Sequence, residues 1–450
     1  MRRMVFIGSH LGYPMERTPL GGGAMVGLNL ARTWAEGGGI QVAALGAGPQ
    51  CPAPGVDYVR LGGKPGAGAP DLVGFSEMEY ARFCRRFEQE STRWLLERTS
   101  RFPPESTAVV VNDISEAPDL EALRRAGYRP ITLWHVDVAD YFCRMYLKGA
   151  VSAAAAIGIY ERLGAAAGVA PDVLKLVFDK QRRAIRFSAR MVFPSSAMAA
   201  VARRACAGVI LPAREFEAKA RVIPWGAWDE APRDPRACAV DQLKNLYQIG
   251  AQSLVLMTLS RLSPEKGVEH LVEALSLLER RGKFRDKDVC VLVCGAPAFM
   301  RGEAYARRVR KAARALRRVR AFFPGYLGPE DKPAFFRLAH LFVSPSVHES
   351  YGLNAMEAMR AGLPALALEH YGSRDWPGGF ARAVSPQKFD GAAKALAAGL
   401  EEMLSDARGL KELGRQAAAD AAARPFSAAA RAVAQEAFSA ADGKPAPILK

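Results

Sequence analysis

The part of the sequence that most restricts the fold is a strand, a loop and a helix that together carry two glutamates. Residues 338–343 form an apolar run, which predicts a buried strand, and residues 354–360 have a helix-forming composition. Glu349 lies in the loop between them, and Glu357 follows about two helical turns later. We therefore expect an α/β fold in which one carboxylate lies beyond a strand end and the other on the following helix.

Two carboxylates in these positions can bind different hydroxyl groups of one ligand, and sugars and riboses offer such hydroxyls. The residues between them would present backbone N–H groups at a helix N-terminus, where unpaired donors and the helix dipole favour an anion. These loop residues are Ser350, Tyr351, Gly352 and Leu353. The alternative is an ordinary amphipathic helix whose two glutamates face water.

A second motif follows another predicted strand, at residues 254–259. Arg261 and Lys266 bracket the loop after this strand, and a helix is expected from about residue 267 to residue 278. Two cations beside the start of a helix can form a clamp for phosphate groups. The alternative is a surface turn that happens to hold two basic residues.

The N-terminal half has its own loop of this kind. Residues 4–7 predict a first buried strand, and Gly21, Gly22 and Gly23 directly precede a predicted helix at residues 24–36. A strand, a glycine-rich loop and a helix follow each other in nucleotide-binding α/β domains, although Gly-x-Gly-x-x-Gly is absent here. Glycines let a backbone approach a phosphate or a sugar closely, and the alternative is a flexible turn.

Polar residues also follow a predicted strand at residues 131–134. His135, Asp137 and Asp140 lie just past its carboxyl end. Ligands of open parallel sheets bind outside those ends, so these side chains are candidates for ligand contact. The alternatives are that the histidine caps local backbone and that the two aspartates cap the next helix.

Together these motifs resemble a known family. Glu349 and Glu357, with the surrounding Pro-Ser, Gly-Leu and Glu-Ala-Met, resemble the Glu-x7-Glu signature of retaining glycosyltransferases of family 4, and Arg261 and Lys266 resemble that family's Arg-x4-Lys motif. Residues 222–226 resemble its Ile-Pro-Asn-Gly turn, with Trp in place of Asn. The resemblance implies the α/β GT-B fold, in which two Rossmann-like doubly wound domains face each other across a cleft.

The resemblance also implies a domain organisation. We expect an N-terminal Rossmann-like acceptor domain, a linker, a C-terminal Rossmann-like domain for the donor nucleotide, a helix that crosses back to the N-terminal domain, and a tail. The corresponding residues are 1–228, 229–250, 251–425, 426–442 and 443–450.

The residue roles that the resemblance implies concern a nucleotide-diphosphate sugar of the UDP, GDP or ADP type. Arg261 and Lys266 would grip its diphosphate, Glu357 its ribose and Glu349 its sugar hydroxyls, and His135 would contact the sugar. The backbone of Ser350, Tyr351, Gly352 and Leu353 would bind the sugar and phosphate, and Gly21, Gly22 and Gly23 would close over the diphosphate. Ser350 departs from the family's usual glycine.

The resemblance implies retention of the anomeric configuration, with no cofactor and no metal ion. Asp286 and Asp288 fit an Asp-x-Asp pattern, but they precede a strand, and we expect them in a solvent-exposed turn. Two alternatives stay open at this point. One is a sugar phosphorylase or a trehalose-type synthase on the same fold, and the other is a non-catalytic nucleotide-sugar-binding protein.

The formal net charge of +16 admits an acidic partner. Eight basic residues are expected on one helix, and we favour a solvated outer helix over a surface that contacts an anionic membrane. They are Arg307, Arg308, Arg310, Lys311, Arg314, Arg317, Arg318 and Arg320. No nucleic-acid-binding motif is present.

Seven scattered cysteines indicate a reducing compartment rather than a disulfide framework. No run resembles a membrane span, and the apolar segment at residues 4–7 is too short for a signal peptide. We expect a cytoplasmic protein, with contact to the inner membrane surface left open, as is the identity of the acceptor.

Overall fold

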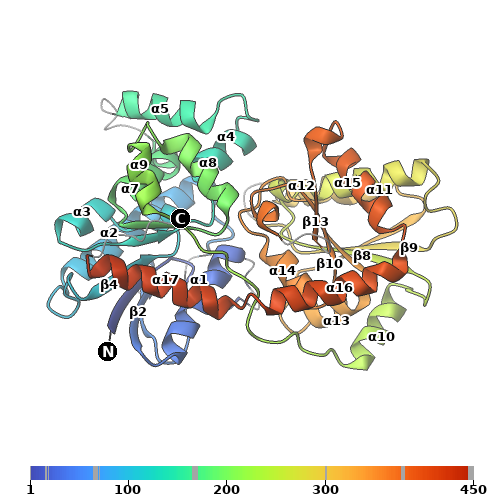
Figure 1. Ribbon diagram of the computed structural model, residues 1–450, viewed down its shortest axis with the longest axis horizontal. Coiled ribbons are helices and arrows are strands. Elements are labelled where there is room, and N and C mark those ends of the chain that lie inside the picture. Colours follow the sequence, from blue (N-terminus) through green and yellow to red (C-terminus); the bar gives the residue numbers. More distant parts are fainter. Residues whose placement is uncertain are drawn as a thin grey trace. The chain divides into compact units, whose positions relative to one another are not determined.

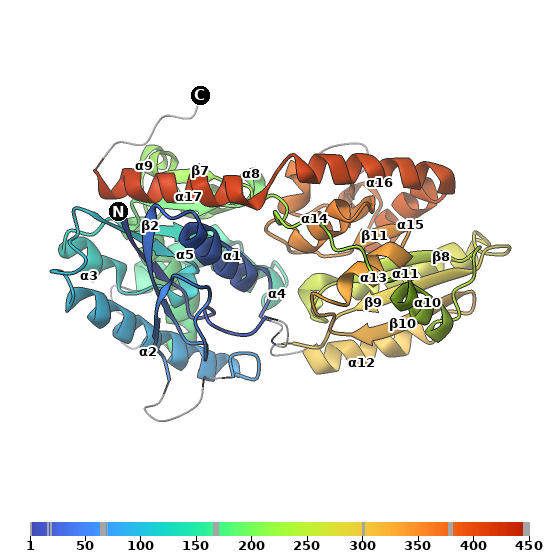
Figure 2. The ribbon, with the colours of Figure 1, turned by 90° about the horizontal axis from the view of Figure 1, so that it is seen from below.

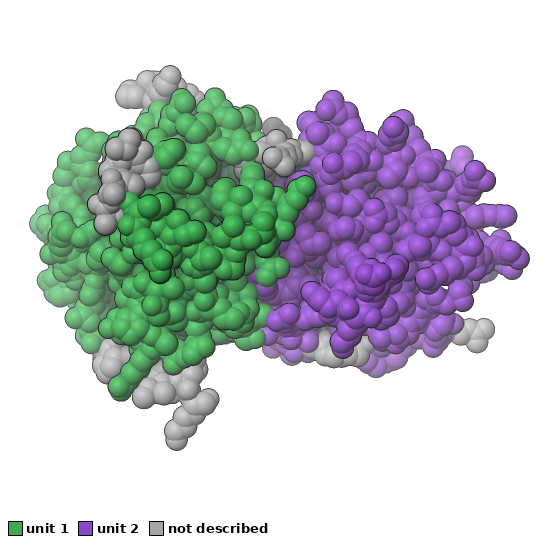
Figure 3. Space-filling view, turned by 90° about the horizontal axis from the view of Figure 1, so that it is seen from above, with its two compact units in different colours: residues 1–225, 427–450 green, residues 226–426 purple. Residues whose placement is uncertain are grey.

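The computed structural model describes residues 2–15, 18, 20–63, 69, 71–164, 171–298, 302–376 and 381–443. The chain divides into two compact units, which Figure 3 colours separately: unit 1 is residues 1–225 with 427–450, and unit 2 is residues 226–426. Unit 2 is therefore one continuous insertion into unit 1. None of the helices in the described ranges combines the length and the apolar character that crossing a bilayer requires.

Unit 1 is built on a seven-stranded parallel sheet with the order β3-β2-β1-β4-β5-β6-β7. Its strands are β1 (Arg2–Ile7), β2 (Ile40–Gly46), β3 (Asp57–Arg60), β4 (Thr107–Val111), β5 (Ile131–Leu133), β6 (Arg190–Phe193) and β7 (Ala220–Val222). The chain runs outward from β1 to β3 and returns to the other side of β1 at β4. The strand order thus reverses between β1 and β4, which is where open parallel sheets bind ligands.

The helices of unit 1 cover both faces of this sheet. They are α1 (Gly22–Glu36), α2 (Glu77–Leu96), α3 (Leu120–Arg125), α4 (Val138–Met145), α5 (Ala153–Gly164), α6 (Asp172–Leu174), α7 (Lys180–Phe187), α8 (Ser196–Cys206), α9 (Ala213–Lys219) and α17 (Phe426–Ala441). Side chains alternate along β1. Val5 and Ile7 join the core beneath α2, whereas Phe6 packs edge-on against Trp34 of α1, with 5.1 Å between ring centroids.

The C-terminal helix α17 packs on unit 1 beside α1, and Figure 2 shows the two helices near each other. The indole N–H of Trp34 donates to the carbonyl of Ala430 over 2.8 Å. Glu436 pairs with Arg190 and Arg221, whose side chains are almost fully buried. These buried contacts attach the last helix to the first unit, although 200 residues of unit 2 precede it in the chain.

Unit 2 repeats the arrangement with six parallel strands in the order β10-β9-β8-β11-β12-β13. They are β8 (Leu254–Leu259), β9 (Val289–Cys294), β10 (Val319–Gly325), β11 (Leu341–Ser344), β12 (Ala365–Leu368) and β13 (Ala381–Val384). Here the order reverses between β8 and β11. The motif with the paired cations follows β8, and the motif with the paired acids follows β11. Both motifs therefore lie where the strand order reverses.

Helices cover both faces of the second sheet (Figure 1). One face carries α11 (Val268–Arg280), α12 (Gly302–Ala313) and α15 (Ala392–Met403), and the other carries α13 (Lys332–Leu338), α14 (Leu353–Arg360) and α16 (Ala407–Ala422). A further helix, α10 (Ala237–Leu246), packs on α13 and falls within the predicted linker. Of the predicted tail, only Gly443 belongs to the described residues.

The prediction of one long basic helix is wrong beyond Ala313. Residues 314–318 form a turn, and Arg320 lies on β10. The carboxylate of Glu279 holds this turn because it accepts hydrogen bonds from the backbone N–H groups of residues 317, 318 and 319. The following residues are aromatic and β-branched, and Pro324 is tolerated because β10 is an edge strand.

Candidate active site

The two loops that follow β8 and β11 form one polar cluster in unit 2. The backbone N–H of Val347, in the loop after β11, donates to the carbonyl of Glu265, in the loop after β8, over 3.0 Å. The side-chain amide of Asn354, at the start of α14, donates to the carbonyl of Leu259, the last residue of β8, over 2.6 Å. The structure therefore brings the predicted cationic turn and the predicted acidic loop together.

An ion pair between Lys266 and Glu349 lies at the centre of this cluster. Their Nζ and Oε2 atoms are 2.5 Å apart, and the side chains are 13% and 23% exposed. Burial alone would raise the pKa of Glu349, but the charge of Lys266, with smaller effects of His370 and His348, lowers it to about 2. Glu349 is therefore an anion at neutral pH.

Arg261, the other predicted cation, lies at the same loop. Its guanidinium is 3.6 Å from the carboxylate of Glu265, which also accepts a 2.5 Å hydrogen bond from the hydroxyl of Ser263. The turn ends at Gly267, whose φ of 59° is left-handed and where a Cβ would lie 2.2 Å from the carbonyl oxygen of Pro345. The two loops can approach this closely because residue 267 has no side chain.

The loop between the two glutamates is fixed by its aromatic neighbours. The hydroxyl of Tyr351 is buried and accepts a hydrogen bond from the N–H of Gly226 over 2.8 Å. The carbonyl of Tyr351 accepts from the indole of Trp376 over 3.1 Å. Gly352 has a φ of 93°, and a Cβ there would lie 2.7 Å from the ring of Trp376. Tyr351 therefore has a structural role, and the loop backbone rather than its side chain is available to a ligand.

Glu357 extends from α14, one turn beyond Asn354, and is 12% exposed. Its Oε1 accepts a hydrogen bond from the indole N–H of Trp228 over 2.6 Å, and its Oε2 is paired with Lys332 over 2.8 Å. Because Asn354 binds the end of β8, Glu357 and Arg261 lie at the same edge of the sheet. The reading of Glu357 as an ordinary solvent-facing residue does not fit these contacts.

His370 is a member of this cluster that the sequence motifs did not indicate. It follows β12, is 4% exposed, and its Nδ1 accepts the backbone N–H of Ser373 over 3.1 Å. Burial lowers its pKa to about 4, so the ring is neutral at physiological pH. In the same loop, Gly372 donates its N–H to the carbonyl of Glu349 over 3.1 Å. A third loop at the sheet edge thus supports the acidic loop.

In unit 1, the predicted glycines and the predicted histidine meet at the strand reversal. The side-chain amide of Asn112, which follows β4, donates to the carbonyl of Gly23 over 3.1 Å, and its oxygen lies 3.2 Å from Nε2 of His135. A Cβ at Gly23 would lie 2.9 Å from the ring of His135. The glycine at position 23 is therefore needed for close packing, which the reading of a merely flexible turn does not explain.

His135 is neutral in this setting. Burial, with repulsion from His10, lowers its pKa to about 4. Its ring packs near Trp225, with centroids 5.7 Å apart. Trp225, in place of the family's asparagine, is thus an aromatic support for the histidine. A neutral imidazole can donate one hydrogen bond and accept another, which suits contact with a sugar hydroxyl.

Unit 1 also contains a buried charged group that the sequence motifs did not indicate. Glu116, after β4, accepts hydrogen bonds from the N–H of Ser9 over 2.8 Å and the hydroxyl of Tyr80 over 2.9 Å, and its carboxylate is 2.9 Å from Nδ1 of His10. Burial would raise the pKa of Glu116, but His10 and these donors lower it to about 2. Only the position of His10 directly after β1 could have suggested this pair.

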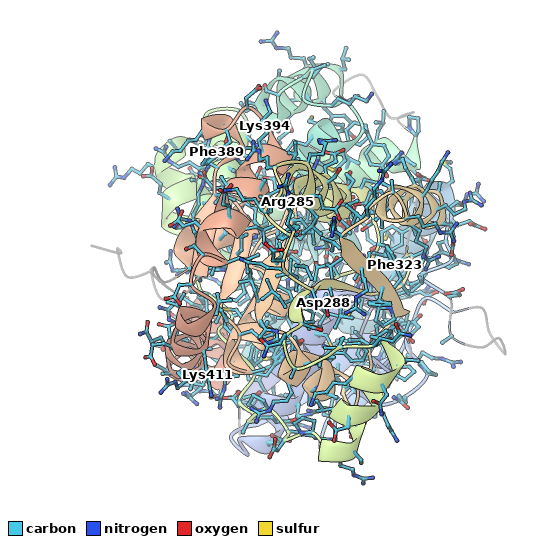
Figure 4. All side chains as sticks on the ribbon, turned by 90° about the vertical axis from the view of Figure 1, so that its right-hand side faces the viewer. Arg285, Asp288, Phe323, Phe389, Lys394 and Lys411 are labelled. Carbon is cyan, nitrogen blue, oxygen red and sulfur yellow. The ribbon has the colours of Figure 1, made fainter. Side chains whose placement is uncertain are left out.

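The remaining candidate acids have structural or surface positions. Asp137 caps α4 by accepting the N–H of Asp140 over 2.9 Å, which agrees with the capping alternative. Asp286 and Asp288 lie in the exposed turn before β9, as expected. Figure 4 shows Asp288 there together with Arg285. Asp288 is engaged by Arg320, with 2.8 Å between the closest atoms.

Two doubly wound parallel sheets, the second with a cationic turn and an acidic loop joined at its strand reversal, are the features of the GT-B fold, so the predicted fold class is confirmed. Residues 241–420, which are 40% of the chain, match the model of the family Glycosyl transferases group 1. This match supports the predicted glycosyltransferase class. Membership of family 4 and the retaining mechanism stay predictions.

Three known proteins illustrate the similarity. D-inositol 3-phosphate glycosyltransferase of Salinispora tropica is 36% identical over 134 residues, which are 29% of this chain and 27% of the relative. Sucrose-phosphate synthase from Thermosynechococcus elongatus has a TM-score of 0.68 at 19% identity, with 97% of this chain and 98% of that chain covered. HepE from Anabaena in complex with UDP-glucose has a TM-score of 0.64 at 16% identity, with 97% and 99% covered.

These similarities differ in what they show. The sequence match spans about a quarter of the curated relative's length. The structural likeness extends over nearly the whole of each chain, and at such low identity it concerns the fold.

Proposed function

We propose that this protein is a glycosyltransferase that moves a sugar from a nucleotide-diphosphate donor to an acceptor hydroxyl, with retention of the anomeric configuration and without a metal ion. The observation that carries the proposal is the ion pair between Lys266 and Glu349. It joins a cationic turn to an acidic loop at the strand reversal of unit 2, where doubly wound sheets bind nucleotides. HepE, which has the same fold, was solved with UDP-glucose, and this supports a nucleotide-sugar as the donor.

The proposed reaction breaks the bond between the anomeric carbon and the diphosphate and forms a bond to the acceptor oxygen. Positive charge develops on the sugar, and negative charge develops on the departing diphosphate. Lys266 and Arg261 would stabilise the diphosphate, because they are already held in place before charge develops. The proton of the acceptor hydroxyl would pass to the departing phosphate, so no side chain is needed as a nucleophile.

The acids and the loop backbone would bind the donor. Glu349 is ionised and can accept hydrogen bonds from sugar hydroxyls, and Glu357 can accept from ribose hydroxyls. The start of α14 favours the negative diphosphate through its backbone donors and its dipole. In unit 1, the neutral His135 is suited to a sugar hydroxyl. Gly21 and Gly22 would let the backbone approach a phosphate, and Gly23 would let the loop pack closely against His135.

The test is transfer by the full-length protein with UDP-, GDP- and ADP-sugars as donors. We expect nucleotide release to require an acceptor, and Lys266→Ala to reduce kcat by about 100-fold or more, because it removes a preorganised cation. Lys283→Ala is the matched control, since Lys283 forms an exposed ion pair with Glu401. A chelator such as EDTA should not change the rate.

Four results would contradict this proposal. Near-normal turnover of the Lys266→Ala variant would show that the cationic turn does not serve the reaction. Strong loss of activity in EDTA would show that a metal ion takes part. Sugar release that depends on inorganic phosphate would support the phosphorylase alternative, and tight nucleotide binding without turnover would support a non-catalytic binding protein.

We also propose that unit 2 contacts an anionic membrane surface. Residues 301–320 hold nine Lys and Arg residues and one acidic residue, whereas the rest of residues 226–426 hold 21 basic and 22 acidic residues. Six of the nine define a basic surface on α12 and the following turn: Arg307, Arg308, Lys311, Arg314, Arg317 and Arg318. All six are exposed, and none forms an ion pair with another residue that the structure describes. Such unpaired cations are attracted to acidic headgroups.

A further inference from the structure

The carboxylate of Glu357 is held from two sides by residues that the motif does not contain. Trp228 donates its indole N–H to Oε1 over 2.6 Å, and Lys332 lies 2.8 Å from Oε2. The two partners are 129 and 25 residues away in the chain, so three separate elements converge on one carboxylate. Glu357 is 12% exposed and Lys332 is 24% exposed, which places the pair in a partly desolvated position.

The position of Lys332 is not explained by its own helix. It is the first residue of α13, directly after the N-cap Asp331. A cation at a helix N-terminus is unfavourable, because the helix dipole has its positive end there. The pair with Glu357 compensates for this cost. Lys332 is therefore placed for the acid on α14 and not for the stability of α13.

Trp228 is held rigidly where the chain enters unit 2. Its ring packs against Phe426, with centroids 5.0 Å apart. The neighbouring Ala227 exchanges two backbone hydrogen bonds with the other end of the unit, because it donates to Arg424 over 2.8 Å and accepts from Phe426 over 2.7 Å. The direction of the indole N–H is thus fixed by packing on one side and by backbone pairing on the other.

These contacts determine which hydrogen bonds Glu357 can still accept. Each carboxylate oxygen has about two lone-pair directions. Trp228 takes one direction on Oε1 and Lys332 takes one on Oε2, which leaves one on each oxygen. Two remaining acceptor positions, side by side on a fixed carboxylate, match the two O–H donors of a vicinal diol. A carboxylate free to rotate would match them less well.

We infer that Lys332 and Trp228 are positioning residues that fix Glu357 to accept both hydroxyls of a ribose, and that they thereby set a preference for ribonucleotides over 2′-deoxyribonucleotides. This inference rests on the proposed binding of a nucleotide-sugar donor. It adds two residues and a selectivity to that function.

The experiment measures nucleotide binding by the full-length protein with isothermal titration calorimetry. The probes are UDP, GDP and ADP, each with its 2′-deoxy counterpart, and the readout is the ratio of the two Kd values for the nucleotide that binds best. For the unmodified protein we expect a ratio of about 10 to 100, because the lost hydrogen bond is to a charged group. Glu357→Gln should bring the ratio close to 1.

The variants that test the inference are Lys332→Met and Trp228→Phe. Each should lower the ratio by about 3-fold to 10-fold, because the carboxylate can then rotate away from the diol. Lys332→Arg, which keeps the charge, should retain most of the preference. Arg337→Ala is the matched control on α13, since Arg337 is exposed and forms no ion pair with a described residue; its ratio should be unchanged.

The ratio separates positioning from a general loss of structure. A variant that merely loosens the unit weakens both nucleotides alike and leaves the ratio as it was, which would overturn the inference. If Glu357→Gln loses the preference while Lys332→Met and Trp228→Phe keep it, the inference is wrong and the proposed function stands. If none of the three nucleotides binds, or if Glu357→Gln has no effect on the ratio, the proposed donor site itself is wrong, and the inference fails with it.

Discussion

At the scale of single residues, the ion pair of Glu349 links protonation to stability. The pKa of this carboxyl is about 2 in the folded protein, compared with 4.5 for an unperturbed glutamate. A group with a lowered folded pKa stabilises the fold above its unfolded pKa, and this stabilisation is lost as the pH falls through the folded value. Glu349 therefore contributes fully at neutral pH and progressively less between pH 4.5 and pH 2.

We predict that Glu349→Gln flattens the acid dependence of unfolding. In the unmodified protein this one carboxyl adds a slope of up to about 1.4 kcal/mol per pH unit to the free energy of unfolding between pH 4.5 and pH 2. Urea unfolding of both proteins at several pH values, followed by far-UV circular dichroism, measures the difference in slope. Equal slopes would show that Glu349 is not held as an anion by Lys266. Glu401→Gln is the control, because Glu401 is partly exposed and pairs with Lys283 on the surface.

A residue of the site can be predicted from the sequence when it closely follows a recognisable strand, and not when it comes from a distant part of the chain. Arg261, Lys266, Glu349 and Glu357 lie in loops or in the first two helical turns after apolar runs, so the strand pattern itself placed them at one sheet edge. His370 also follows an apolar run, β12, and its position there could have suggested it. Lys332 and Trp228 carry no such signal. They reach the site only through tertiary packing, and no local pattern predicts which distant side chain meets a given carboxylate.

At the scale of single elements, the start of α1 depends on the absence of side chains. Gly23 faces the ring of His135, and Gly27, one turn later, faces Asn112, where a Cβ would lie 2.8 Å from the amide nitrogen. The first turns of α1 are therefore packed against the loops after β4 and β5. An added methyl group must displace a neighbour, and such overpacking typically destabilises a protein by about 1–3 kcal/mol.

We predict that Gly23→Ala lowers the stability of the protein by about 1–3 kcal/mol and raises the KM for the donor, because His135 is the side chain that must move. Gly158→Ala is the matched control. It changes a helical glycine on α5 with nothing within 4 Å, and it should raise stability by roughly 0.5–1 kcal/mol. Thermal unfolding and donor kinetics measure both effects. An unchanged KM for Gly23→Ala would show that the glycine loop does not contribute to donor binding.

Elements were predictable where the apolar pattern was continuous. Strand β8 begins and ends at the predicted residues, because a parallel strand buried on both faces is a plain apolar run. The basic segment after residue 307 was predicted as one helix. Its many charged residues hide the point at which the spacing of apolar residues changes from that of a helix to that of a strand. Its end is set by Glu279, a residue on another helix, which a local pattern cannot contain. Helices α5 to α7 were not predicted, since their short alanine-rich and charged stretches lack a clear apolar stripe.

At the scale of the whole molecule, the positive charge is unevenly distributed. Unit 2 without residues 301–320 is nearly balanced, so the basic surface accounts for its charge excess. Electrostatic attraction between exposed cations and acidic lipids falls steeply as salt shortens the Debye length to about 8 Å at physiological ionic strength. If the basic surface binds a membrane, the binding should therefore weaken steeply as the salt concentration rises.

We predict that the protein sediments with vesicles that contain phosphatidylserine, and much less with phosphatidylcholine alone, and that raising the salt from 50 mM to about 500 mM releases it. The triple variant R314Q/R317Q/R318Q should lose most of this binding while turnover with a water-soluble acceptor stays normal. The matched control K388Q/K394Q/K411Q removes three exposed charges elsewhere on unit 2; Lys394 and Lys411 are labelled in Figure 4. If both triple variants bind vesicles equally, the basic surface is only a solvated face. A loss of turnover in R314Q/R317Q/R318Q would instead place the acceptor there.

The chain leaves unit 1 after Trp225 and re-enters it at Ser427, and the two ends of the intervening segment are hydrogen-bonded to each other through Ala227, Arg424 and Phe426. The points where the chain leaves and re-enters unit 1 therefore lie side by side, and the insertion of unit 2 keeps Trp225 and Ser427 close together.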